Sequence, residues 1–165
     1  MRKLCILLCC VLLLQMLCAC NGKNEELKAP VNFYFRNKEI TYDSPTAVIY
    51  PEVREGAGFH ENLTAMLRSY FVGPNSETLE RFIPADVYMV SCEHEADEVT
   101  IVMSSQFSEL TGMDLTAACS ALLLTVHDFT GAQTLRISAK DAQLDGKDEI
   151  VISIEDIVLI DTVQQ

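Results

Sequence analysis

Basic residues are scarce in this chain, which carries 12 Lys and Arg side chains against 24 Asp and Glu side chains and has a net charge of −12. No run of Lys or Arg forms a basic patch. A surface of this charge repels nucleic acid and anionic lipid headgroups, because both are polyanions. The sequence therefore predicts no nucleic-acid partner.

The residue patterns that usually mark a catalytic site are also missing. His60, His94 and His127 are scattered, with no HExxH motif, no paired histidines at helical spacing and no CxxC motif. Cys92 and His94 would share one face of a strand, but a core thiol beside a turn histidine explains this pair better than a nucleophile does. We expect no enzyme activity, no catalytic residue and no cofactor.

Carboxylates gather in two predicted loops, at residues 93–98 and 141–149. Neither loop has the oxygen-ligand register of an EF-hand or of a calcium-binding nonapeptide repeat. Solvated acidic loops account for both segments. We therefore assign no metal ligand.

The N-terminus holds the one long apolar run, 16 residues from Leu4 to Ala19, after the basic pair at positions 2 and 3. It closes with Leu17-Cys18-Ala19-Cys20. This order resembles the lipobox of bacterial lipoproteins, in which the signal peptide is cut before a cysteine whose thiol is acylated. We predict cleavage between Ala19 and Cys20, and diacylglycerol and palmitate on Cys20. The alternatives are an ordinary secretory signal and an uncleaved membrane helix, although a spanning helix needs roughly 20 residues.

The domain organisation follows from this segment. Residues 1–19 are a signal peptide, residues 20–30 a polar tether, and residues 31–165 a single domain. The mature chain would keep 10 basic against 24 acidic side chains, a net charge of about −14. Acylation would hold it at the outer face of the cell membrane, and the ten residues after Cys20 reach at most ~33 Å. A partner must therefore lie close to the membrane.

Two cysteines remain in the mature domain besides the acylated one. Cys92 stands in a predicted strand and Cys119 in a predicted apolar helix. Lone cysteines in such elements are more often buried thiols than a bridge, but the extracytoplasmic compartment permits a disulfide. The pairing of Cys92 with Cys119 stays open.

Hydrophobic periodicity predicts an α+β domain, with two helices packed on one face of a mainly antiparallel sheet. An apolar stripe predicts a helix over 63–71 that ends at Gly73-Pro74. A second helix, capped by Asp114, runs to about residue 129 and is buried on most sides. Pro51 is expected to end the strand at 47–50. Strands are expected at 31–35, 47–50, 87–92, 99–103, 135–139 and 150–154.

Several of these segments together resemble the GerMN domain of sporulation and spore-germination proteins. The helix that runs into Gly73-Pro74 is followed by Leu79 and by Ile83-Pro84 before a strand, which is the family's order. Phe107, Leu124-Thr125 and the strand at 135–139 then occupy further family positions. The resemblance covers residues 31–140 and leaves 141–165 unaligned. Some family members look like two such domains in tandem, whereas this chain has room for one.

The resemblance implies a lipid-anchored, non-enzymatic binding or scaffolding module that acts in sporulation or spore-germination envelope assembly. Its partners would be envelope proteins, with oligomerisation possible, and its contact surface would be a sheet edge or the helix-free face. The alternative is a small solute- or polymer-binding lipoprotein of the cell envelope. An apolar pocket with convergent polar groups would favour that alternative.

Overall fold

The computed structural model describes residues 30–43, 47–59 and 62–157. Over these residues the chain forms seven strands, two α-helices and three short 3-10 turns. In chain order they are β1 Val31–Asn37, β2 Ile49–Arg54, η1 Gly56–Phe59, α2 Leu63–Val72, β3 Leu79–Glu80, β4 Met89–Glu95, β5 Glu98–Met103, η2 Ser105–Glu109, α3 Gly112–Thr130, β6 Thr134–Ala139, β7 Glu149–Ser153 and η3 Ile154–Asp156.

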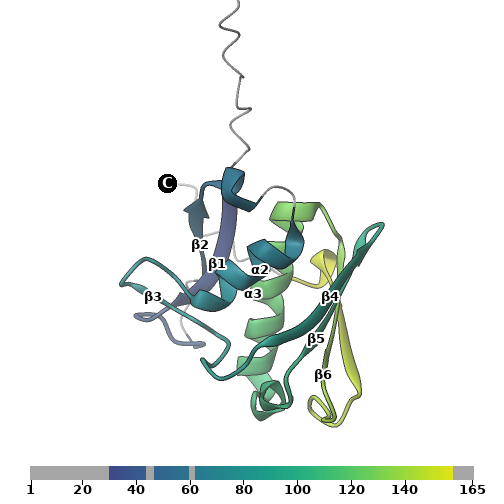
Figure 1. Cartoon of the computed structure of the whole chain (residues 1–165). Helices are drawn as coiled ribbons and strands as arrows, with labels where there is room; N and C mark the ends of the chain where they lie inside the picture. Colours follow the sequence, from purple (N-terminus) through teal and green to yellow (C-terminus); the bar gives the residue numbers. More distant parts are fainter. Residues whose placement is uncertain (1–29, 44–46, 60–61, 158–165) are drawn as a thin grey trace, which may run out of the picture.

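The fold class is α+β, as predicted, but the strands divide between two sheets rather than forming one. One sheet has the order β2-β1-β3 and the other the order β4-β5-β6-β7. All neighbours are antiparallel except β5 and β6, which are parallel. A parallel pair needs a crossover connection, and η2 with α3 provides it here. Helix α3 lies between the two sheets, and α2 lies beside β4 (Figure 1).

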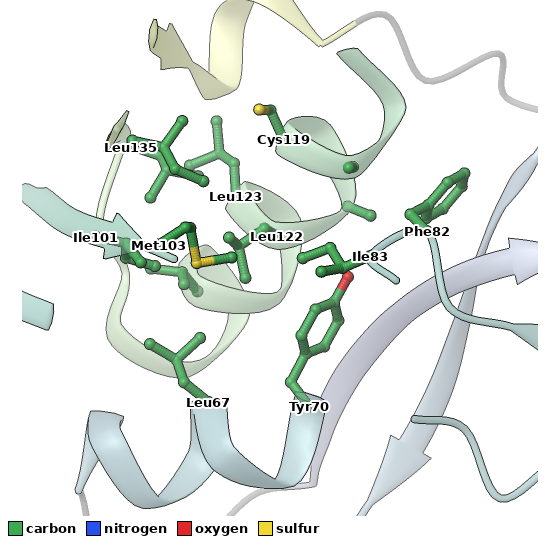
Figure 2. Close-up of a cluster of buried hydrophobic side chains, with 14 of the residues drawn as sticks. Leu67, Tyr70, Phe82, Ile83, Ile101, Met103, Cys119, Leu122, Leu123 and Leu135 are labelled. Atoms are coloured by element: carbon green, nitrogen blue, oxygen red, sulfur yellow. The ribbon is translucent and has the colours of Figure 1, made fainter. Parts of the chain in front are cut away.

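The core forms where the two helices meet both sheets. Tyr70 of α2 stacks on Phe35 of β1, with ring centroids 5.1 Å apart. Figure 2 shows side chains of α2, α3 and β5 converging on one another. The buried residues there include Leu67, Tyr70, Ile101, Met103, Leu122, Leu123 and Leu135.

Helix α2 begins and ends where its sequence predicts. Asn62 is the N-cap, and its Oδ1 accepts the backbone N–H of Ala65 at 3.0 Å. Gly73 ends the helix with φ +104, a conformation that strains residues with a Cβ. Its N–H donates to the carbonyl of Tyr70 at 3.0 Å. These contacts confirm Asn62 and Gly73 as the ends of the helix.

Helix α3 begins before the residue that was predicted to cap it. The N-cap is Thr111, and Asp114 lies inside the first turn, so the prediction of Asp114 as the cap is wrong. A carboxylate in the first turn still interacts favourably with the helix dipole. Asp114 Oδ1 also accepts the hydroxyl of Tyr42 at 2.7 Å. At the other end Gly131 takes the left-handed conformation, with φ +79, directly after the last residue of the helix.

Strand β2 runs through Pro51, which was predicted to bound it. Pro51 lies opposite Tyr34 of β1. The N–H of Tyr34 points away from β2 and donates to Thr125 Oγ1 of α3 at 3.0 Å. Tyr34 and Pro51 are therefore a pair without mutual hydrogen bonds. The sheet loses no hydrogen bond through the missing N–H of proline.

The chain turns back within the connection predicted at 93–98, but this connection is shorter than expected. Strand β4 continues to Glu95 and β5 starts at Glu98, so the hairpin turns on Ala96 and Asp97 alone. Ala96 takes φ +54 to close this turn. At the start of β4 a register shift falls between Met89 and Ser91. The first residues of the predicted strand, 87 and 88, precede β4. Within the loop predicted at 141–149, Asp145 and Gly146 both take positive φ, in a turn between Leu144 and Lys147.

Candidate binding surface

The histidines within the described residues are held by local backbone groups. His127 Nδ1 lies 2.9 Å from the carbonyl oxygen of Ala132 at the end of α3. His94 Nε2 lies 3.0 Å from the carbonyl oxygen of Ala96 in the hairpin turn. These contacts fix ring positions in a helix end and in a turn. His60 lies outside the described residues.

Neither cysteine of the described domain is part of a disulfide. Burial raises the pKa of the Cys119 thiol to about 12, which keeps it protonated at neutral pH and therefore a poor nucleophile. Cys92 is half-buried, and its Sγ lies 3.1 Å from Thr64 Oγ1 of α2. Cys92 thus joins β4 to α2.

The carboxylates of the two acidic segments take part in several structural contacts. Arg136 pairs with Glu98 at 3.1 Å and also with Glu149. Asp145 Oδ2 accepts the N–H of Gly112 at 3.0 Å, which joins the β6–β7 connection to the start of α3. Within the described ranges no group of three or more His, Cys, Asp or Glu side chains is arranged to hold a metal ion.

The residues of the Gly-Pro motif lie at a packed helix end. A Cβ on Gly73 would come 3.1 Å from Arg81 Cδ, so the position restricts side-chain size as well as φ. Pro74 follows directly and cannot continue the helix. Pro84 begins the turn before β4, and its carbonyl accepts the N–H of Val87 at 3.3 Å. These residues shape the connection from α2 to β4.

An ion pair that is mostly shielded from solvent holds the same helix end from the other side. Arg54 Nη2 lies 2.6 Å from Glu52 Oε1, and the two side chains are 10% and 11% exposed. The guanidinium also donates to the carbonyl oxygens of Ser69 at 3.2 Å and Gly73 at 2.6 Å. Its carbon lies 4.4 Å from the ring centroid of Phe33. Arg54 thereby satisfies carbonyls at the end of α2 that have no partner within the helix.

A groove of about 470 Å³ runs between α2 and β4. Thr64, Arg68 and Phe71 form its helix wall, at the spacing that places residues on one helix face. The other wall is residues 88–92. In it the side chains of Tyr88 and Val90 are 61% and 45% exposed. Apolar side chains this exposed on one rim form a surface that a partner could cover.

The backbone of β4 next to this groove is open on one side. Among the described residues β4 pairs with β5 alone, which places it at the edge of its sheet. The carbonyl of Asp97 accepts the N–H of Thr134 in β6 at 3.1 Å, and that of Met103 accepts the N–H of Lys140 at 2.8 Å. Odd-numbered β5 residues therefore turn their backbone groups to β6. The β4 residues opposite them form pairs without mutual hydrogen bonds. The N–H and C=O groups of these β4 residues therefore point away from β5.

Those partners are Met89, Cys92 and His94, which lie opposite Met103, Ile101 and Val99. Their N–H and C=O groups point to the open edge. Such an edge is a template for another strand.

Charge differs between the two sides of this edge. Arg68 is exposed on the groove side and forms no ion pair with a described residue. Glu93 and Glu95 lie opposite Thr100 and Glu98 of β5, so they project from the helix-free face. Both are exposed. The edge is therefore cationic and apolar on one side and anionic on the other.

The sequence did not single out the groove residues. Val90 and Tyr88 looked like ordinary strand residues, and their exposure follows from a tertiary arrangement. The available signal was Arg68, a charged residue between the apolar positions of the helix predicted at 63–71. Cys20 and Ala19, which were predicted from the lipobox, lie outside the described residues. In the described part of the chain no helix is long and apolar enough to cross a membrane.

Comparisons with known proteins identify similar folds. No protein-family model matches the chain, and no curated protein matches it. The tandem GerMN domains of the sporulation protein GerM from Bacillus subtilis align with a TM-score of 0.54 and 12% identity, over 82% of this chain and 49% of that one. A candidate lipoprotein from Clostridium perfringens aligns with a TM-score of 0.44 and 16% identity, over 78% of this chain and 89% of that one. The fold is therefore similar to that of GerMN domains, and the chain spans about half of the tandem structure.

Proposed function

We propose that this protein is a lipid-anchored, non-enzymatic binding module of the bacterial cell envelope. Cys20 would hold it at the outer face of the cell membrane, and it would act by contact through the α2–β4 groove. The observation that carries the proposal is a strand edge that no described residue pairs with, beside an exposed apolar groove. The fold similarity to GerMN domains of a sporulation protein supports a role in sporulation or spore germination. The partners we propose are envelope proteins.

The shape of the groove favours a polypeptide over a small solute. A small-molecule site buries most of its ligand's surface. Here Tyr88 and Val90 stand 61% and 45% exposed on the rim, so a small molecule would remain largely in water. A polypeptide would cover these side chains and could also use the outward backbone groups of β4.

Complementation of a strain that lacks this protein tests contact against catalysis. Joint replacement of His60, His94 and His127 by Ala should leave sporulation and germination efficiency at wild-type levels. Retained circular dichroism would establish that the variant folds. If this folded variant lost function, a catalytic or metal site would have to be sought instead.

The groove is tested by the double substitution of Arg68→Glu and Val90→Glu. Both side chains are exposed, so the fold should tolerate the changes, while a partner would meet reversed charge and a new carboxylate. The matched control is Val151→Glu on β7, at the other edge of the sheet, where the side chain is 47% exposed. The double variant should lose complementation and the control should retain it. Equal results for the two would contradict the proposed surface.

A further inference from the structure

We infer that the α2–β4 groove binds an extended peptide segment of a partner protein, which adds to β4 as a further strand and alternates apolar with basic residues. This inference rests on the proposed function and specifies the partner's chemistry. Strand addition at a sheet edge draws affinity from main-chain hydrogen bonds and specificity from alternate side chains. The β4 edge offers both free main-chain groups and two chemically different faces for side chains.

The main-chain component comes from the outward backbone groups of β4. Cys92 and His94 lie opposite Ile101 and Val99 and turn their N–H and C=O groups away from β5. Cys92 and His94 are two residues apart, so the backbone groups of both can form hydrogen bonds with the same added strand. The α2 wall, with Phe71 at its apolar end, would cover one face of that strand.

The side chains that the added strand should carry follow from the chemistry of the groove face and of the helix-free face. A residue of the added strand opposite Cys92 would project toward the groove, where Phe71, Met89 and Val90 offer apolar contact and Arg68 repels a basic group. A residue opposite Glu93 would project from the helix-free face beside an exposed carboxylate. Apolar residues on the groove side and Lys or Arg on the other side satisfy both faces.

Charge also argues against a second copy of this chain as the occupant. The chain has a net charge of −12, so two copies repel each other at long range. Strand β4 itself carries Glu93 and Glu95 where the added strand should carry bases. A partner segment of opposite charge would instead be steered toward this edge.

The probe is the fluorescein-labelled peptide Lys-Val-Lys-Val-Lys-Val-Lys, titrated by fluorescence anisotropy. The mature lipidated protein, which begins at Cys20, is used in nanodiscs of phosphatidylcholine, a lipid without net charge to attract the peptide. A peptide of the same composition without alternation should bind at least about 10-fold more weakly. Replacement of both Glu93 and Glu95 by Lys should weaken binding by about 10-fold, because two attractive cross-strand pairs become repulsive.

Two matched pairs test the strand pairing itself. N-methylation of the alternate peptide amides that face β4 should abolish binding, whereas methylation of the other set should preserve it. In the protein, His94→Pro removes an outward N–H of β4. Val151→Pro removes the equivalent outward N–H of β7, because Val151 lies opposite Arg136, whose backbone faces β5. We expect at least about a 10-fold loss for His94→Pro and no change for Val151→Pro.

Each other outcome overturns the inference. Equal effects of the two methylation patterns, or of the two proline variants, would exclude strand addition at β4. Absent peptide binding would exclude this partner chemistry. Concentration-dependent dimerisation that His94→Pro abolishes, measured by sedimentation, would identify a second copy as the occupant. None of these outcomes decides the complementation test of the Arg68→Glu and Val90→Glu double variant. The proposed function is therefore tested separately from the peptide chemistry.

Discussion

Replacement of Arg54 by Ala should be among the most destabilising single changes at the end of α2. The side chain is 10% exposed and pairs with Glu52, which is 11% exposed. Loss of one partner from a buried pair costs about 3–5 kcal/mol, because the other charge loses its compensation. Glu52 Oε2 would keep the N–H groups of Asn75 and Ser76, each at 2.8 Å. We therefore expect about 3 kcal/mol, the lower end of that range.

The assay is thermal and urea unfolding followed by circular dichroism. A loss of about 3 kcal/mol should lower Tm by roughly 10 °C in a domain of this size. The control is Arg136→Ala, whose side chain is 34% exposed and which pairs with Glu98 and Glu149 on the sheet surface. Exposed pairs contribute little to stability because solvent screens them, so this variant should lower Tm far less. Equal losses for the two variants would refute the reasoning that burial makes the Arg54 pair matter.

Three further predictions concern the anchor and the core. Cys20→Ala, expressed in a Gram-positive host, should lack the lipid by intact-mass analysis and be released from membranes; a membrane-bound variant that keeps residues 1–19 would indicate a signal anchor instead. Gly73→Val should destabilise by about 1 kcal/mol or more, because φ +104 strains a β-branched residue, and an unchanged Tm would refute this account of the helix end. The buried Tyr70 hydroxyl has no hydrogen-bond partner among the described residues, so Tyr70→Phe should raise the unfolding free energy by about 1 kcal/mol; a loss of that size would show that the hydroxyl is paired.

Local signals allowed the helices to be predicted from sequence. The apolar stripe of α2 and the glycines at both helix ends depend on neighbours in the chain, and the structure confirms them. The α3 cap was misplaced by a few residues, because Asp114 is as suitable in the first turn as at the N-cap. Helix boundaries carry this ambiguity wherever an acidic residue lies near the start.

The division into two sheets could not be predicted in the same way. It depends on β5 pairing in parallel with β6 and on α3 occupying the free side of β1, where Asp128 and Thr125 accept the N–H groups of Asn32 and Tyr34. Contacts between residues this far apart in sequence leave no periodic signal. The candidate groove was missed for the same reason, since it exists only once α2 lies beside β4.

Photo-crosslinking in intact cells tests the central claim, contact with an envelope partner through the α2–β4 groove, most directly. A photoreactive amino acid is placed at Val90 on the groove rim and, as the control, at Val151 on the opposite edge; the two side chains are 45% and 47% exposed. We predict a discrete adduct with one envelope protein from Val90 and none from Val151, with the Val90 adduct lost in the Cys20→Ala background. Equal adducts from both positions, or an adduct from Val151 alone, would contradict the account.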